Sequence, residues 1–403
     1  MFVRILFALP YGPSETRVRS RMLLETLAPL HDITLLALAW DATDRAALDA
    51  WRTQLSTVVT IEHPPLARVR GVLGDPRRPL QGIVSTSAAF ARRARELVRN
   101  AQRVGRPFDV VHVEHLRGAS ALDLADRLPV RTVFDSVDCI AELARLTARF
   151  GEKRSVRLLA RIEQRRTARF EATLLQAADV VTVVAERDRL ALAGTRDDPR
   201  VRVVPNGVRS LDRPVALTHE PIAIFTGKLS YHANQAAVRY LLDEIWPLVR
   251  IERPDARLVI AGAEPPHWMT QHHGQAGTTL IANPGDMQEI ISGARVALAP
   301  IVYSVGMQNK VLEALGCGVP VVATPSAVAG LRLPDTTLIP TAFDSAAFAR
   351  ETVRLLETGS TAEALGRRGH DWVRQTYSWK ATAEAFEALY QPPGELERKE
   401  VVA

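Results

Sequence analysis

A short stretch in the second half of the chain carries residues that could bind a phosphate and a ribose. Residues 303–306 are predicted to form a loop, and a helix is predicted to begin at residue 309. The exposed backbone N–H groups of a helix N-terminus attract a phosphate. Lys310 lies in the first turn, where a cation is unfavourable unless an anionic ligand supplies negative charge. Glu313 follows on the same face of the helix, where its carboxylate could accept two hydrogen bonds from a ribose diol. The alternative is an ordinary Lys–Glu pair on the surface.

The first half of the chain holds a second group of polar residues in the loop after its first apolar run. Tyr11 and Gly12 begin this loop, and a glycine allows a ligand or another backbone to approach closely. Arg17 and Arg19 follow, and either could reach a phosphate or an acidic acceptor. The alternative is that both arginines lie on a solvated helix face.

Carboxylates and histidines stand at the ends of two other apolar runs. His112 and Glu114 share one face if their run is a strand, and His115 then points the other way. A lone histidine on a strand is more often structural than functional. Asp135 and Asp138 follow the next run, where they could orient acceptor hydroxyls or cap the helix that begins near residue 140.

The elements that must position these residues are short apolar runs alternating with helical patterns along the whole chain. Runs buried on both faces are typical of parallel strands, and helices between them indicate βαβ crossovers. Ligands of such folds bind at the carboxyl ends of the strands, where the polar residues above are found. One helical pattern of the second half covers residues 234–249. The predicted strands cover residues 2–9, 33–39, 58–61, 108–113, 131–134, 180–184, 201–204, 222–225, 258–261, 279–281, 296–299 and 319–322.

The alternation restarts near residue 222, after a stretch that contains Pro and Asp. This restart predicts an α/β fold with two domains of similar size, joined by a linker in residues 206–221. No G-x-G-x-x-G pattern follows the first strand, where residues 9–12 read Leu-Pro-Tyr-Gly, so a Rossmann-type dehydrogenase is disfavoured.

The composition limits the class of protein. The chain has 403 residues, of which 47% are hydrophobic and 24% charged, as is ordinary for a globular protein. No apolar run approaches the ~18 residues of a membrane-spanning helix, and the N-terminus lacks the apolar stretch of a signal peptide. Cys139 and Cys317 are too few for a disulfide framework and lack metal-ligand spacing. We therefore expect a cytoplasmic protein.

The formal net charge of +6 favours anionic partners. Nucleic acid ranks last among them, because the chain has no zinc-finger spacing, RNA-binding aromatic signature or basic tail. Residues 145–170 hold nine Arg or Lys against two Glu. This segment could make a peripheral contact with the inner face of the plasma membrane, extended by Arg68, Arg70, Arg77 and Arg78, or it could be a solvated helix face.

The stretch 306–324, which reads GMQNKVLEALGCGVPVVAT, resembles the donor-binding region of retaining GT-B glycosyltransferases of family 4. Within that family (glycosyl transferases group 1), it is closest to a bacterial sugar-transferase subgroup with a GxQNKxLEAxxxGxPVVAT motif. Four other segments resemble motifs of the family in the same order. They are VPNGV at 204–208, FTGKL at 225–229, PDARLVIAG at 254–262 and YSW at 377–379.

The resemblance implies a GT-B fold, with two Rossmann-like domains facing each other across a cleft. Residues 1–206 would form the acceptor-binding domain, 207–376 the nucleotide-sugar-binding domain, and 377–403 a helix packing back on the first domain. The implied reaction moves a sugar from a nucleotide-diphosphate donor to an acceptor hydroxyl with retention of configuration. The acceptor would be a saccharide, a lipid-linked saccharide or a small molecule in polysaccharide, glycolipid or glycoconjugate biosynthesis. No metal or other cofactor is expected.

The resemblance also carries over to single residues of the donor site. Glu313 falls on the second glutamate of the family's E-x7-E pattern, which binds the ribose hydroxyls, whereas the first glutamate falls on Val305. Sugar recognition must then use other groups, and the backbone N–H groups of Met307 and Gln308 are the candidates. Lys310 resembles a phosphate-contacting lysine, with Gly306 and Asn309 in the same donor-binding loop. The loop that begins at Ile281 falls where relatives contact the nucleobase.

Four residues are implied to act in catalysis. Lys228, next to Gly227, stands where many members carry an arginine that holds the diphosphate together with a second cation, here Lys310. Many relatives place a histidine near the transferred sugar at the position of Glu114, with His115 next to it. Tyr11, Gly12, Arg17, Arg19, Asp135 and Asp138 are the expected acceptor-side residues.

Two other functions fit the same fold. A nucleotide-sugar epimerase or hydrolase uses the same architecture, because fold does not determine reaction. The valine at position 305 also fits a non-catalytic nucleotide-binding subunit.

Overall fold

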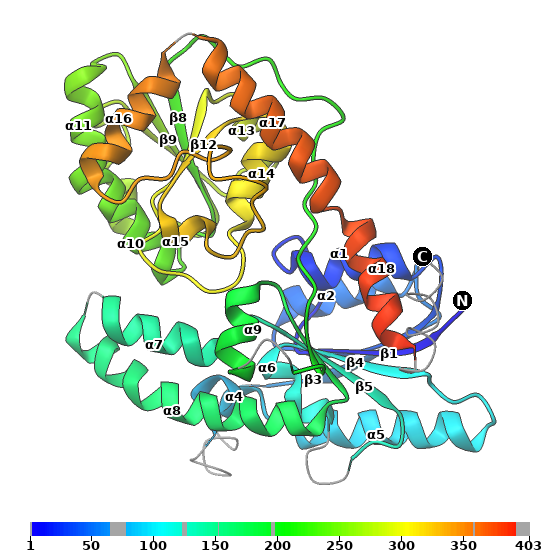
Figure 1. The fold of residues 1–403 in the computed structure, drawn as a ribbon. Helices are drawn as coiled ribbons and strands as arrows, with labels where there is room; N and C mark the ends of the chain where they lie inside the picture. The colour runs from blue at the N-terminus through cyan, green and yellow to red at the C-terminus, as the bar shows by residue number, and fades with distance from the viewer. Residues whose placement is uncertain are drawn as a thin grey trace. The chain divides into compact units, whose positions relative to one another are not determined.

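A computed structural model describes residues 2–64, 78–122, 127–151, 153–194, 198–357 and 359–391. The chain divides into two compact units, shown in Figure 1. Unit 1 contains Met1–Arg149, Lys153–Pro205 and Trp379–Ala403, and unit 2 contains Phe150–Glu152 and Asn206–Ser378. The last helix therefore belongs to unit 1, although it follows unit 2 in the sequence.

Unit 1 is built on a seven-stranded parallel sheet with the strand order β3-β2-β1-β4-β5-β6-β7. Its central strands are apolar on both faces because helices cover both sides of the sheet. Ile5 of β1 pairs with Ile33 of β2 on one side and with Val110 of β4 on the other. The strands are β1 (Arg4–Leu9), β2 (Asp32–Ala39), β3 (Thr57–Glu62), β4 (Val110–Glu114), β5 (Arg131–Val137), β6 (Val180–Val183) and β7 (Val201–Val203).

Two hydrophobic cores lie on the two faces of this sheet. Leu23 and Leu27 of α1 share one core with Phe386 and Tyr390 of α18. The other core contains side chains of α5, α8 and the short helix η1. The helices of unit 1 are α1 (Val18–Leu27), α2 (Ala42–Trp51), α4 (Leu80–Ser85), α5 (Ala88–Arg103), α6 (His115–Gly118), η1 (Ala119–Leu122), α7 (Ile140–Phe150), α8 (Arg154–Ala177), α9 (Glu186–Ala193) and α18 (Trp379–Tyr390).

Unit 2 has a five-stranded parallel sheet with the strand order β10-β9-β8-β11-β12. Its strands are β8 (Ile222–Thr226), β9 (Arg257–Gly262), β10 (Thr278–Ala282), β11 (Val296–Ala299) and β12 (Val321–Ala323). Its helices are α10 (His232–Tyr240), η2 (Leu241–Ile245), α11 (Trp246–Glu252), α12 (His267–Thr270), α13 (Met287–Ser292), α14 (Asn309–Cys317), α15 (Pro325–Val328), α16 (Ser345–Leu356) and α17 (Ser360–Thr376). The predicted fold class of two parallel-sheet α/β domains is confirmed.

The helix predicted over residues 234–249 is confirmed as helical throughout, but it is not uniform, because a π-helical turn, η2, lies between α10 and α11. Pro247 lies in the first turn of α11. Proline has no N–H to donate to the carbonyl four residues earlier, and its ring crowds that carbonyl, so the regular ladder cannot continue through it.

No helix in the described ranges is both long and apolar enough to cross a lipid bilayer.

Candidate functional site

Lys310 is the centre of a polar cluster at the carboxyl ends of β8 and β11 in unit 2. Its Nζ donates a hydrogen bond to Asn234 Oδ1 at 2.6 Å and lies 4.3 Å from the centre of the Phe225 ring. The Asn234 amide in turn donates to the Lys228 carbonyl at 2.8 Å. The first turn of α10 thus ties the loop after β8 to the first turn of α14.

Two glycines allow these loops to approach each other. Gly227 has a φ of 148°, and a Cβ there would lie 2.9 Å from Asn234 Nδ2 and 3.1 Å from Lys310 Nζ. At Gly262, the last residue of β9, a Cβ would lie only 1.7 Å from the Gly227 carbonyl oxygen. Any side chain at position 262 would therefore displace the loop that carries Lys228.

The charges around Lys310 favour the binding of an anion. Burial lowers the pKa of Lys310 to about 7, although the Glu313 carboxylate acts in the opposite direction. Burial also raises the pKa of Glu313, and the Lys310 ammonium acts against that shift. The pair therefore compensates its own burial incompletely, and a bound anion would return Lys310 to its charged form.

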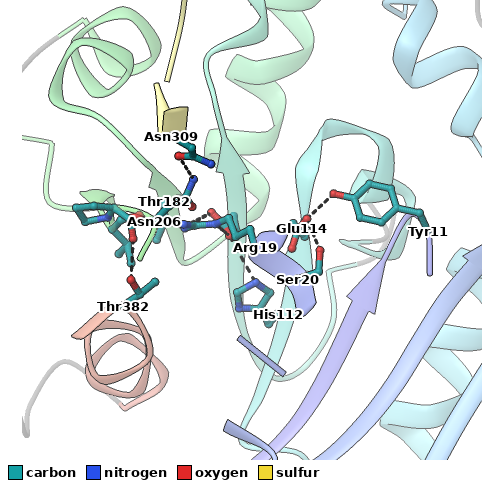
Figure 2. A network of polar contacts seen from close by, with 12 residues as sticks. Tyr11, Arg19, Ser20, His112, Glu114, Thr182, Asn206, Asn309 and Thr382 are labelled. Atoms are coloured by element: carbon teal, nitrogen blue, oxygen red, sulfur yellow. Dashed lines mark hydrogen bonds and ion pairs between the residues drawn. The ribbon is translucent and has the colours of Figure 1, made fainter. Parts of the chain in front are cut away.

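The other predicted donor residues lie at the same end of the sheet. No side chain caps the N-terminus of α14 within the described part of the chain. Gly306, with a φ of 62°, ends the loop that precedes Met307, Gln308 and Asn309. Asn309 Oδ1 accepts a hydrogen bond from Asn206 Nδ2 at 3.4 Å, and this contact is drawn in Figure 2.

Lys228 differs from Lys310 in its exposure. About half of the Lys228 side chain is exposed, and its Nζ lies 3.1 Å from Glu264 Oε1 after β9. Such an exposed ion pair is weak, so another anion can replace the Glu264 carboxylate beside Lys228. Ile281 lies at the end of β10, two strands away from β8 in the sheet order. Val305, which replaces the first glutamate of the family pattern, is buried.

Glu114 in unit 1 accepts hydrogen bonds from two hydroxyl groups, as Figure 2 shows. Its Oε1 accepts hydrogen bonds from the Tyr11 hydroxyl at 2.5 Å and the Ser20 hydroxyl at 2.7 Å. Its Oε2 is buried and has no partner among the described residues. Burial, together with the charge of Asp135, raises the pKa of Glu114 to about 7, against the lowering effect of these hydrogen bonds. This carboxyl group can therefore hold or release a proton near neutral pH.

Arg19 and Asp135 form a buried ion pair, with Arg19 Nε 2.6 Å from Asp135 Oδ2. Asp135 also accepts from the Thr182 hydroxyl at 2.8 Å, and Arg19 donates to the Val204 carbonyl at 3.1 Å. Burial raises the pKa of Asp135, but the charge and hydrogen bonds of Arg19 outweigh it and hold the pKa below its usual value. The suggestion that Arg19 lies on a solvated helix face is wrong. Both side chains hold α1, β5 and β6 together.

His115 does not follow the strand alternation expected from the sequence. β4 ends at Glu114, and His115 begins α6 with a φ of 60°. Burial lowers the pKa of His115 to about 3, and the charges of Arg117 and Arg17 lower it further, so the ring is neutral. His115 Nδ1 accepts a hydrogen bond from the Arg117 backbone N–H at 3.2 Å.

The remaining acceptor-side candidates lie around the first loop. Arg17 stacks its guanidinium 4.3 Å from the centre of the Tyr11 ring. Gly12 donates its N–H to Asp44 Oδ1 at 3.1 Å, and a Cβ at Gly12 would lie 2.5 Å from the Asp44 carbonyl oxygen. Gly12 therefore serves the packing of this loop on α2.

Asp138 does not cap α7, and neither does Asp135. The backbone N–H of Ile140 donates instead to Glu171 Oε1 at 2.7 Å. Burial and the nearby charge of Asp188 raise the pKa of Asp138 to about 7. The helix-capping alternative for the two aspartates is therefore wrong.

Sequence reasoning missed Asn234 and Ser20, which fix Lys310 and Glu114. Both stand in the first turn of a helix that follows a candidate loop. A polar residue at such a position can reach the loop, and this could have indicated them.

Two family models match most of the two units. The model described as Glycosyltransferase Family 4 matches residues 18–210, and the model described as Glycosyl transferases group 1 matches residues 220–358. The chain is built from two glycosyltransferase domains. No curated protein matches the sequence significantly.

Solved structures give the same result at the level of fold. A HepE protein from Anabaena, solved with UDP and glucose, has a TM-score of 0.67 and 13% identity over 97% of this chain and 100% of that chain. A glycosyltransferase from Rickettsia africae has a TM-score of 0.62 and 12% identity over 96% of this chain and 97% of that chain. A TarM mutant from S. aureus, solved with fondaparinux, α-GlcNAc-glycerol and UDP, has a TM-score of 0.55 and 12% identity, over 73% of this chain and 58% of that chain. At these identities the likeness concerns the GT-B fold.

Proposed function

We propose that this GT-B glycosyltransferase moves a sugar from a nucleotide-diphosphate donor to an acceptor hydroxyl with retention of anomeric configuration. The observation that carries the proposal is Lys310, a half-buried amine whose pKa is lowered to about 7, beside Glu313 and the uncapped N-terminus of α14. These groups match a nucleoside diphosphate, because the cation and helix end suit the phosphates and the carboxylate suits the ribose diol.

In the proposed reaction the bond between the anomeric carbon and the diphosphate oxygen breaks, and the acceptor oxygen bonds to that carbon on the same face. The acceptor proton passes to the departing phosphate. Negative charge develops on the leaving group, and Lys310 and Lys228 stabilise it together with the N–H groups of α14. Because Val305 is apolar and buried, the sugar is held by the backbone N–H groups of Met307 and Gln308 instead of a carboxylate.

Unit 1 supplies the acceptor side in this proposal. Glu114 Oε2 has no partner in the described part of the chain, and it can accept a hydrogen bond from an acceptor hydroxyl. Tyr11 keeps its proton because burial and the neighbouring Glu114 raise its pKa, so it remains a donor that orients that carboxylate. We place the reaction in the cytoplasmic biosynthesis of a polysaccharide, glycolipid or glycoconjugate, without a metal or other cofactor.

The first experiment identifies the donor. A thermal-shift screen of UDP, GDP, ADP and dTDP and their sugars should reveal one base, and a ligand at 100 times its Kd should stabilise the protein by ~2.7 kcal/mol. Product formed from that donor is then examined by NMR for the configuration at the anomeric carbon. Inversion of configuration would refute the retaining mechanism.

A matched pair of lysine variants tests the site itself. Lys310→Ala should lower kcat by about 100-fold or more, as expected for the loss of one charge-stabilising group. Lys380→Ala is the control, because 84% of the Lys380 side chain is exposed on α18. Near-normal transfer by Lys310→Ala would refute the assignment. Product formed from the donor alone would indicate an epimerase or hydrolase, and nucleotide binding without turnover of any acceptor would indicate a binding subunit.

A further inference from the structure

We propose that one face of α8 docks on an anionic lipid membrane, in the plane of the headgroups. This face, called here the α8 face, consists of Arg154, Leu158, Arg161, Ile162, Arg165 and Arg169. At 100° per residue these six side chains fall within an arc of about 100° on the helix. The proposal rests on the surface of unit 1 and does not depend on the transfer reaction.

The centre of the α8 face is apolar and exposed. Leu158 is 61% exposed and Ile162 is 48% exposed, one turn apart on the helix. The opposite side of α8 packs into unit 1 through buried residues that include Thr167, Phe170 and Leu174. The helix is thus already anchored by its other side, and the two apolar side chains contribute nothing to that anchoring. Residues four apart are neighbours on a helix surface, so Leu158 and Ile162 form one exposed apolar strip.

The border of the α8 face carries only positive charge. The four arginines of the face form no ion pair with any residue that the structure describes. The two acidic side chains of α8 are occupied elsewhere. Glu163 Oε2 accepts from the Leu80 N–H at 2.7 Å while its Oε1 pairs with Arg166, and Glu171 binds the N-terminus of α7. Arg68, Arg70 and Arg77, which were predicted to extend the basic surface, lie outside the described residues.

An anionic membrane fits this combination better than another polyanion. Arginine side chains reach the lipid phosphates with their heads while their stems remain near apolar groups. Leu158 and Ile162 can then enter the boundary between headgroups and acyl chains, as the apolar residues of interfacial helices do. A nucleic-acid backbone would engage the same arginines but leave both apolar side chains in water. Figure 1 shows α8 as a long helix along unit 1.

Vesicle flotation tests the proposal with the full chain. The wild-type protein should bind vesicles of phosphatidylcholine with phosphatidylglycerol and stay unbound with phosphatidylcholine alone. Leu158→Ser with Ile162→Ser should weaken binding by about tenfold or more. Arg161→Glu with Arg165→Glu should weaken it by at least about fivefold for each arginine, because each cation near an anionic leaflet contributes that much. Val104→Ser is the control, since Val104 is 71% exposed on unit 1 outside α8.

Three results would overturn the proposal. One is equal binding to both kinds of vesicle, and another is binding that survives the Leu158 and Ile162 substitutions at full strength, which would indicate adsorption to any polyanion. The third is a dimer in light scattering without lipid that the same substitutions dissociate, which would make the α8 face a contact between copies of the chain. Thermal melting confirms that each variant is folded, and exposed positions of this kind tolerate substitution.

Discussion

Nucleotide binding by unit 2 should depend on pH through Lys310. The pKa of this lysine is about 7 in the free protein, and a diphosphate beside the ammonium would raise it. The protonated form is therefore the one that binds, so affinity is highest well below pH 7, is about half of that maximum near pH 7, and falls further as the pH rises. At pH 9, two units higher, only ~1% of free molecules carry the proton, which weakens binding by about 100-fold, or ~2.7 kcal/mol, relative to the fully protonated protein and by about 50-fold relative to pH 7. A bound-state pKa below 9 would make the decrease smaller.

Isothermal titration calorimetry between pH 7 and 9 measures this effect with the nucleoside diphosphate that stabilises the chain. The range avoids the titration of the phosphate itself, whose second pKa is about 6. Lys310→Arg should bind with little pH dependence, because a guanidinium stays charged throughout. Lys310→Ala should bind weakly at every pH. A wild-type Kd that is constant over the range, or the same slope in Lys310→Ala, would show that Lys310 does not bind the diphosphate.

Three further predictions concern stability. Gly262→Ala should destabilise the protein by about 1–3 kcal/mol in urea denaturation, because its Cβ would meet the Gly227 carbonyl; an unchanged midpoint would contradict the close approach. Arg19→Met should cost about 3–5 kcal/mol, since it leaves the buried Asp135 carboxylate unpaired. Adding Asp135→Asn should recover part of that loss in a double-mutant cycle, and strict additivity would argue against the pair. The free energy of unfolding of Glu114→Gln, compared with that of the wild type, should increase as the pH rises from about 5 to 8. The folded-state pKa of about 7 lies above the usual value, so wild type loses stability as it ionises; parallel pH profiles in thermal melts would show that this shift is absent.

The strands of both sheets were predictable from the sequence for a simple physical reason. A parallel strand covered on both faces must be apolar along its whole length, as Phe7 and its neighbours are in β1. The helix over 234–249 was not resolved into its parts, because a proline such as Pro247 is also compatible with the first turn of a helix. The periodicity of apolar residues therefore predicts where helices and strands lie, but it does not reveal a π-helical turn within a helix.

The candidate site was predictable only where its residues are close in the sequence. Lys310 and Glu313 lie in one stretch, so their relation to a helix N-terminus could be inferred directly. Arg19 and Asp135 are 116 residues apart, and their ion pair exists because α1 packs beside β5. From the sequence alone, a charged side chain near the end of an element is as compatible with solvent or ligand as with a distant partner. Whether such a side chain is buried depends on tertiary packing, which the spacing of nearby residues in the sequence does not reveal.

The placement of α18 in unit 1 has a consequence for the order of folding during synthesis. Phe386 and Tyr390 complete a core built from α1, β1 and β2, and the Tyr390 hydroxyl lies 2.9 Å from Nδ1 of the buried His112. All of unit 2 leaves the ribosome before these two side chains do. Unit 2 can therefore finish folding before unit 1 does. Until α18 is synthesised, the part of unit 1 that is already made keeps an apolar surface uncovered.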